Sequence, residues 1–384
     1  MIAPGAFKGS LGAKEVAEAL AEGVRRVWPE ARVQCLPLSD GGDGWVESIV
    51  AAADGSFVDV RVCGPLGEPV EARYGMIESD GVTTAVIEMA KASGLALVPK
   101  DRRDPRRATT HGTGELIRDA LERGAERLLI GIGGSATNDG GAGMAAALGV
   151  RFLKRDGTEL PHGGAALADL HEVDLSGLDG RLKDVEVVVA NDVANPLLGD
   201  DGASAVYGPQ KGAGPETVRE LDAALSRFAE VVERQVGRQL RDEPGAGAAG
   251  GIGFGLMAFC GARLQPGVEL ALDALEADLL LQDASLVVTA EGMVDSQTLA
   301  GKLPVGVARR AKQHRVPVVA VGGAVAPMGP SVLERFHEEG IVVICSTVES
   351  PAPEEELMDP EGTRQRLGRA AERITKLVDL GAQL

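Results

Sequence analysis

The stretch from Leu129 to Leu148, LIGIGGSATNDGGAGMAAAL, constrains the fold of this chain more than any other. Its apolar start predicts a buried strand, its glycines and Asn-Asp pair predict a turn, and the segment from Met144 predicts the start of a helix. Because glycines let backbone N–H groups approach a ligand, and a helix N-terminus carries unpaired donors, such a loop can hold a phosphate. The stretch lacks the Lys-Ser/Thr of a P-loop and the spacing G-x-G-x-x-G. A glycine turn that only lets the helix pack on the sheet is therefore an equally good interpretation.

The same order of strand, loop and helix recurs near both ends of the chain. This order is typical of a parallel sheet whose functional loops follow the carboxyl ends of its strands. At the start, we expect strand residues at 1–4 and 32–38 and helices at 13–27 and 45–52. In the last third, we expect strands at 286–289, 318–321 and 341–345, and helices at 305–314 and 360–378.

The middle of the chain has a different pattern. Apolar and polar residues alternate between Phe57 and Val98, which favours a mixed sheet. Further along, we expect a helix at 116–123, an apolar strand at 185–190 and a long amphipathic helix at about 215–240. We therefore predict an α/β protein with two α/β domains and its active site in the cleft between them. A discontinuous Rossmann-like parallel-sheet domain comprises residues 1–60 and 262–384, and an inserted mixed-sheet domain with the glycine loop comprises residues 61–261.

Composition excludes several classes of protein. The chain has 384 residues, 3% aromatic residues and a formal net charge of −18, so it lacks the basic and aromatic surfaces of a nucleic-acid-binding protein. Its four cysteines show no metal-binding or disulfide spacing, and no apolar run is long enough to span a bilayer. The first residues lack the basic and apolar regions of a signal peptide, so we expect none. We expect a cytoplasmic protein that acts on small molecules, as a monomer or homodimer.

Several charged residues follow expected strands, where catalytic side chains commonly lie. The acids of this group are candidates for binding Mg²⁺ or accepting a hydroxyl proton, and its lysines are candidates for binding an anionic substrate. For each one alone, a solvated surface charge is an equally good interpretation. The group consists of Asp40, Asp43, Asp192, Glu291, Asp295, Lys8 and Lys211.

Six segments, in the same order along the chain, together resemble one family. They are APGAFKGSL (3–11), GIGGSATNDGGAGM (131–144), NDVANPLLGDDGA (191–203), GPQKGA (208–213), PGAGAAGG (244–251) and EGMVDSQTLAGK (291–302). These segments look like those of the bacterial glycerate 2-kinases, the type I glycerate kinase family. The resemblance implies ATP-dependent and Mg²⁺-dependent phosphorylation of D-glycerate to a phosphoglycerate. We expect 2-phospho-D-glycerate, although the sequence alone does not distinguish transfer to the 2-hydroxyl from transfer to the 3-hydroxyl. The sequence departs from the pattern of the family at Gly5, where an Asp is usual, and at Met293, where an Arg is usual.

Residue by residue, we expect three groups of functional side chains. The catalytic group is Asp192, Lys8 and Asp295, with Asp192 as the base that accepts the hydroxyl proton and Asp295 as its alternative. His111, which is included among the substrate-binding residues, suits a structural hydrogen-bonding role equally well. Glycerate is expected at Ser10, Asp40, His111, Gln210 and Lys211, nucleotide at Gly133, Gly134, Ser135, Thr137, Asn138 and Asp139, and Mg²⁺ at Asp43, Glu291 and Asp295.

Two other classes of function suit an α/β fold with a glycine loop. A nicotinamide-dependent oxidoreductase of small hydroxy acids requires a G-x-G-x-x-G after the first strand, which the first loop, GAFKGS, does not supply. A non-catalytic protein that binds a small anion has no need of several acids at loop ends. Consumption of ATP in the presence of D-glycerate distinguishes it from a kinase.

Overall fold

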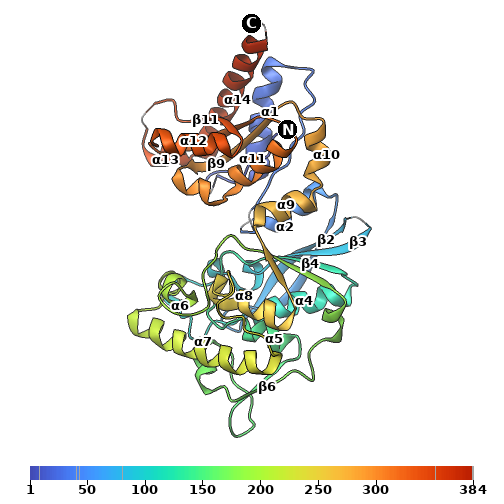
Figure 1. Ribbon diagram of the computed structural model, residues 1–384, viewed down its shortest axis with the longest axis vertical. Helices are drawn as coiled ribbons and strands as arrows, with labels where there is room; N and C mark the ends of the chain where they lie inside the picture. The colour runs from blue at the N-terminus through green and yellow to red at the C-terminus, as the bar shows by residue number, and fades with distance from the viewer. Residues whose placement is uncertain (8, 40, 43, 80, 351, 383–384) are drawn as a thin grey trace. The chain divides into compact units, whose positions relative to one another are not determined.

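The computed structural model describes the whole chain except residues 8, 40, 43, 80, 351 and 383–384 (Figure 1). The expected roles of Lys8, Asp40 and Asp43 therefore fall outside the described residues. The chain forms two compact units. Unit 1 consists of Met1–Asp40 and Val268–Leu384, and unit 2 consists of Gly41–Gly267.

A parallel sheet forms the centre of unit 1. Its strand order is β11-β10-β9, and Ile2 extends it by parallel bridges to Val288 of β9 and to Cys35. Residues 1–4 were expected to end a strand and residues 32–38 to form one, but among the described residues these segments form only isolated bridges, supported by backbone hydrogen bonds: Ile2 bridges to both Val288 and Cys35. The strands are β9 (Val287–Val294), β10 (Val318–Val325) and β11 (Ile341–Ser346). The helices are α1 (Ala13–Val27), α9 (Gly267–Ala274), α10 (Ala277–Gln282), α11 (Leu303–Gln313), α12 (Pro330–Glu338), α13 (Glu354–Met358) and α14 (Pro360–Ala382).

Helices α1 and α14 pack side by side at a point where each has a glycine (Figure 1). A Cβ on Gly23 would lie 2.2 Å from the Gly368 carbonyl oxygen, so the two backbones approach more closely than any side chain allows. The apolar stripe of α1, which includes Val16 and Leu20, is buried with Leu367 and strand residues such as Val288. This buried cluster is the core of unit 1.

A six-stranded mixed sheet forms the centre of unit 2, with the order β1-β2-β3-β4-β7-β8. The pairs β1/β2 and β2/β3 are antiparallel, and the pairs from β3 to β8 are parallel, as the change of sequence pattern predicts. The strands are β1 (Ser56–Cys63), β2 (Pro69–Ser79), β3 (Val82–Glu88), β4 (Arg127–Gly131), β7 (Glu186–Ala190) and β8 (Arg263–Gln265), with β5 (Arg151–Leu153) and β6 (Glu172–Asp174) as a separate pair. The helices are α2 (Trp45–Ala52), α3 (Ala90–Ser93), α4 (His111–Glu122), α5 (Ala142–Ala147), α6 (Ala203–Tyr207), α7 (Pro215–Val236) and α8 (Ala248–Phe259).

The structure divides the chain at different residues from those expected. Helix α2 and residues 56–60 of strand β1, which the sequence analysis assigned to the first domain, belong to unit 2, because β1 is the edge strand of its sheet and α2 packs against β2 and β3. Unit 2 also extends to Gly267 rather than to residue 261, since β8 pairs with β7. The core of unit 2 includes Ile117 of α4, Ile130 of β4, Phe228 of α7 and Phe254 of α8.

Candidate functional site

The parallel strands of unit 2 bring several expected site segments to one edge of the sheet. Glu88 at the end of β3 pairs with Gly131 at the end of β4, and Gly131 pairs with Ala190 at the end of β7. The glycine loop after β4 and the loop that begins at Asn191 therefore start next to each other. This carboxyl edge is where ligands of open α/β sheets usually bind.

Only the beginning of the glycine loop is accessible. Gly134 is exposed and Gly133 is half-buried, whereas the residues from Ser135 to Asp139 are buried. Residues 93–95 pair with the loop: Leu95 N donates to Gly134 O at 2.8 Å, and Ala136 N donates to Ser93 O at 2.9 Å. Gly134 has φ +74, a conformation that favours glycine. Within residues 133–139, Gly133 and Gly134 are thus the accessible residues.

Asp139 connects the loop to two helices. Its carboxylate accepts hydrogen bonds from Thr110 N at 2.8 Å, Thr110 Oγ1 at 2.9 Å, and the backbone N–H groups of Gly141 and Gly143 at 3.2 Å each. Complete burial raises the pKa of Asp139, and the four hydrogen bonds oppose this by favouring the carboxylate. Asp139 thus ties the start of α5 to the start of α4.

The neighbouring loop residues are also engaged within the protein. Asn138 Nδ2 donates to Ser204 Oγ at 2.9 Å. The carbonyl oxygen of Thr137 accepts from Lys211 Nζ at 2.7 Å, and Ser135 Oγ accepts from the same Nζ at 2.7 Å. Lys211, which was expected to bind glycerate, is only 1% exposed, and these two contacts engage its ammonium within the protein. Gln210, the residue before it, is exposed.

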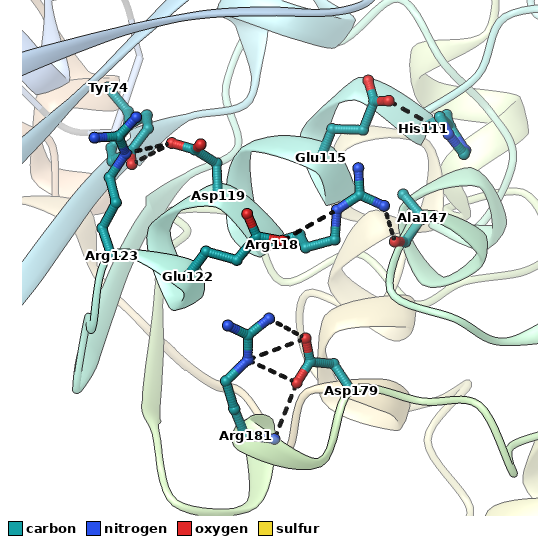
Figure 2. Close-up of polar contacts among 10 residues, drawn as sticks. All are labelled: Tyr74, His111, Glu115, Arg118, Asp119, Glu122, Arg123, Ala147, Asp179 and Arg181. Carbon is teal, nitrogen blue, oxygen red and sulfur yellow. Dashed lines mark hydrogen bonds and ion pairs between the residues drawn. The ribbon is translucent and has the colours of Figure 1, made fainter.

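His111 begins α4 and lies beside Glu115, the next side chain along the same helix face (Figure 2). Its Nε2 is 3.8 Å from Glu115 Oε1, and its ring meets that of His162 edge-on, with centroids 4.7 Å apart. Burial and the nearby His162 lower the pKa of His111, so the neutral imidazole predominates at pH 7. Arg118, also on α4, donates to the carbonyl oxygen of Ala147 at 3.2 Å and so holds the end of α5 (Figure 2).

Asp192 lies exposed after β7, and its Oδ1 accepts a hydrogen bond from Gly267 N at 2.9 Å. Side-chain hydrogen bonds organise the loop around it. Asn191 Nδ2 donates to Val193 O, Asn195 Nδ2 donates to Asp201 O, and Tyr207 OH donates to Asn195 Oδ1, each at 2.7 Å. A carboxylate at a strand end in such a braced loop is well placed for chemistry.

Unit 1 holds the other pair of acids. Asp295 Oδ1 caps the short helix η6 (Ser296–Ala300) by accepting from Gln297 N at 2.9 Å and Thr298 N at 3.2 Å. The buried Thr298 donates its hydroxyl to Glu291 Oε1 at 2.6 Å, so its side chain binds one carboxylate while its backbone N–H binds the other. Lys302 Nζ lies 3.6 Å from Asp295 Oδ1. Glu291, expected in a loop, belongs to β9.

Three further positions of interest also lie in unit 1. Ser10 Oγ donates to Thr363 Oγ1 of α14 at 2.9 Å, so its hydroxyl is engaged within the protein. Gly5 is buried, and a Cβ there would lie 3.2 Å from Leu303 Cδ1, which leaves little space for the Asp that is usual in the resembled family. Met293, in the place of the usual Arg, is 50% exposed and has room for a longer side chain.

One acid at the edge of the unit 2 sheet escaped the sequence analysis. Glu88 is 1% exposed at the end of β3, and its Oε1 lies 3.8 Å from Lys91 Nζ. Its local signal is an acid at the last position of an apolar strand, whereas Asp192 lies just beyond the end of β7. Within the described part of the chain, no three His, Cys, Asp or Glu side chains lie together in an arrangement suited to a metal ion.

Comparison with known proteins agrees with the resemblance. The model of the glycerate kinase family matches residues 1–379. The chain is 50% identical to a glycerate kinase of Bacillus subtilis (strain 168) over 359 residues, covering 94% of this chain and 92% of the relative. It is 46% identical to a glycerate 2-kinase of Escherichia coli (strain K12) over 381 residues, covering 99% and 98%.

A solved structure gives the same result for the fold. A crystal structure of a protein described as a glycerate kinase 2 from Salmonella typhimurium LT2 matches with a TM-score of 0.89 and 46% identity, covering 100% of this chain and 98% of the other. Among the helices described here, none is long and apolar enough to cross a membrane. From the family match, the relatives and the fold together, we conclude that this chain belongs to the glycerate kinase family.

Proposed function

We propose that this protein transfers the γ-phosphoryl group of ATP to the 2-hydroxyl of D-glycerate, giving 2-phospho-D-glycerate and ADP. The observation that carries this proposal is the family match over residues 1–379, together with a relative named glycerate 2-kinase that aligns with 99% of the chain. The comparisons give no support to an oxidoreductase or to a non-catalytic anion-binding protein.

The nucleotide phosphates are proposed to bind at Gly133 and Gly134. These residues are the accessible part of the glycine loop, and they follow a strand at the carboxyl edge of the sheet. Phosphoryl transfer requires the γ-phosphate to be aligned with the attacking oxygen and its charge to be neutralised. Ser135, Thr137, Asn138 and Asp139 contribute by holding the loop, as their internal hydrogen bonds indicate.

Asp192 is proposed as the base. Its loop follows β7, which pairs directly with the strand before the glycine loop. As the 2-hydroxyl oxygen forms its bond to the γ-phosphorus and the bond to ADP breaks, the hydroxyl proton passes to the Asp192 carboxylate. The hydrogen bond from Gly267 N orients this carboxylate.

Glu291 and Asp295 are the described acids proposed to hold Mg²⁺. Mg²⁺ binds one or two protein carboxylates together with phosphate and water oxygens, and these two carboxylates fit that requirement because Thr298 fixes them relative to each other. When bound, the ion neutralises phosphate charge. Asp43, the third expected ligand, lies outside the described residues.

Phosphorus NMR of purified protein with ATP, Mg²⁺ and D-glycerate tests the proposal directly. We expect the signal of 2-phospho-D-glycerate to grow as that of the ATP γ-phosphate falls. A reaction with L-glycerate controls for stereochemistry, and a reaction without an acceptor measures ATP hydrolysis. Formation of 3-phosphoglycerate would correct the position of transfer, and the absence of any phosphoglycerate would overturn the proposed activity.

A further inference from the structure

Lys211 of the GPQKGA segment is buried inside unit 2, which is a rare position for a lysine. It ends the short helix η5 (Pro209–Lys211) and is followed by Gly212, whose φ is +101. A Cβ at Gly212 would lie 2.5 Å from the Arg103 carbonyl oxygen, and Arg103 Nη1 donates to Gln210 O at 3.4 Å. The backbone on both sides of Lys211 is thus fixed against the Arg103 segment.

The ammonium of Lys211 makes two short contacts with the glycine loop. Its Nζ donates to Ser135 Oγ and to the Thr137 carbonyl oxygen, each at 2.7 Å. The same carbonyl packs against Gly250, where a Cβ would lie only 1.9 Å from it. Lys211 and Gly250 together leave the Thr137 carbonyl almost no freedom to move.

Lys211 is buried, and its hydrogen-bond partners Ser135 and Thr137 follow the accessible glycines. We infer that Lys211 is a positioning residue for nucleotide binding: by holding Ser135 and Thr137, it keeps Gly133 and Gly134 in the arrangement that receives a phosphate. This inference rests on the proposed function for its ligand, but its structural part concerns the loop alone.

The two hydrogen bonds do not require Lys211 to be charged. Burial lowers the pKa of Lys211 to about 7, against the opposing influence of Asp139. An ammonium has three donors and a neutral amine has two, so either form satisfies both oxygens. Lys211 therefore acts as a pair of donors rather than as a charge for the substrate.

The test compares Lys211→Met with Glu233→Gln. Glu233 is also buried in unit 2, but its carboxylate accepts from Leu240 N and Arg241 N, both at 2.8 Å, away from the glycine loop. We expect both variants to lower the melting temperature. Only Lys211→Met should speed amide hydrogen exchange at residues 133–139, and only it should raise the KM and the Kd for ATP, by about 10- to 100-fold, the factor expected for loss of a buried hydrogen-bond partner. The KM for glycerate should change little.

Ser135→Ala gives a second, milder test, because it removes one acceptor of Lys211 with little change in volume. We expect a smaller rise in the KM for ATP, and no further rise when Ser135→Ala is combined with Lys211→Met beyond that of Lys211→Met alone. If Lys211→Met fails to fold, Ser135→Ala decides the question.

Unchanged hydrogen exchange of the loop amides and unchanged ATP affinity in a folded variant would overturn the positioning role. Loop exchange needs no turnover, so an inactive wild-type protein would refute the proposed activity and leave this test intact.

Discussion

Gly134 is the residue on which the proposed phosphate contact depends most directly. It is exposed, has φ +74, and a Cβ there would meet Ala90 Cβ at an ordinary 3.5 Å. In Gly134→Val, the branched side chain disfavours this left-handed conformation by about 1–2 kcal/mol and occupies the space of a phosphate. We expect ATP affinity, measured by calorimetry, to fall at least about tenfold while the circular dichroism spectrum is retained.

Gly157 provides the matched control for this substitution. It has φ +81, a Cβ there would have no described atom within 4 Å, and it lies in the turn where Lys154 N donates to Thr158 O. Gly157→Val should impose similar backbone strain without changing ATP affinity. If Gly134→Val binds ATP as the wild type does, the glycine loop is only a packing turn.

Asp192 and Asp295 are distinguished by replacing each with its amide. Asp192→Asn retains Oδ1 for the hydrogen bond from Gly267 N but cannot accept a proton, so kcat should fall by about 10²–10⁴ while ATP and glycerate affinities stay within a few fold. Asp295→Asn retains a capping oxygen for η6 and should mainly raise the Mg²⁺ concentration required. Asp200→Asn, at an exposed position in the following loop, is the control. A near-normal kcat in Asp192→Asn would move the base assignment to Asp295.

Lys211 also predicts a pH dependence of stability. Its pKa is about 7 in the folded protein, against 10.5 for an ordinary lysine, so the unfolded chain binds more protons between these pH values. The contribution of Lys211 to the free energy of unfolding therefore rises with pH across this window, by up to about 1.4 kcal/mol per pH unit. Asp139 is the charged group that opposes the shift.

Urea unfolding at pH 7 to 10 measures this effect. The free energy of unfolding of the wild type should rise with pH relative to that of Lys211→Met, which lacks the titrating group. Glu233→Gln should run parallel to the wild type over this range. Parallel curves for wild type and Lys211→Met would show that the lysine keeps an ordinary pKa when folded.

At the scale of elements, the contact between α1 and α14 is the most sensitive packing point of unit 1. A Cβ on Gly23 would lie 2.2 Å from Gly368 O and 2.7 Å from Ala371 Cβ, and neither backbone can move without separating the helices. Gly23→Ala should destabilise the protein by at least about 1–3 kcal/mol, the usual cost of overpacking. Gly381→Ala, at an exposed position of α14 where a Cβ would have no described atom within 4 Å, should be neutral or stabilising by up to about 1 kcal/mol. Equal melting temperatures for the two variants would contradict this account.

The elements that sequence predicts well are those with a clear local pattern. Helices α1 and α2 begin and end at the expected residues, because each has an apolar stripe and follows a glycine. Helix α7 ends at Val236 rather than near Leu240, since Gly237 takes a left-handed conformation with φ +70. The amphipathic pattern continues past Gly237, so the pattern alone placed the end of the helix too late, although the glycine is a local signal for that end.

The bounds of helices and strands differ from the predicted ones where contacts between residues distant in sequence determine them. Strand β9 continues to Val294 because Gly322 to Val325 of β10 pair with it, and this pairing has no local signal. Helix α4 starts at His111, within a glycine-rich segment of low helix propensity, because Gly112 and Gly114 allow close contact with the carbonyl oxygens of Cys63 and Met144. Likewise, nothing in GPQKGA indicates that its lysine points into the protein.

At the scale of the whole molecule, each unit has its own core and its own sheet. All residues of the larger buried cluster lie between Val62 and Ala262, within unit 2. A fragment of residues 41–267 should therefore fold alone, with slow hydrogen exchange in β4 and β7 as in the full chain. A peptide of residues 1–40 should remain unfolded, because α1 packs on α14 and the residues on either side of Ile2 form backbone hydrogen bonds with Val288. A fragment 41–267 without protected amides would show that its core depends on unit 1.

The bridge between Ile2 and Val288 has a consequence for biosynthesis. Met1 N donates to Leu286 O and Ala3 N donates to Val288 O, so these residues pair with a strand that is synthesised 285 residues later. Most nascent chains fold from the N-terminus onwards. Here all of unit 2 is synthesised before the second part of unit 1. The apolar stripe of α1 therefore stays exposed until β9 and α14 have been synthesised. Apolar surface that is exposed in this way during synthesis is prone to aggregation.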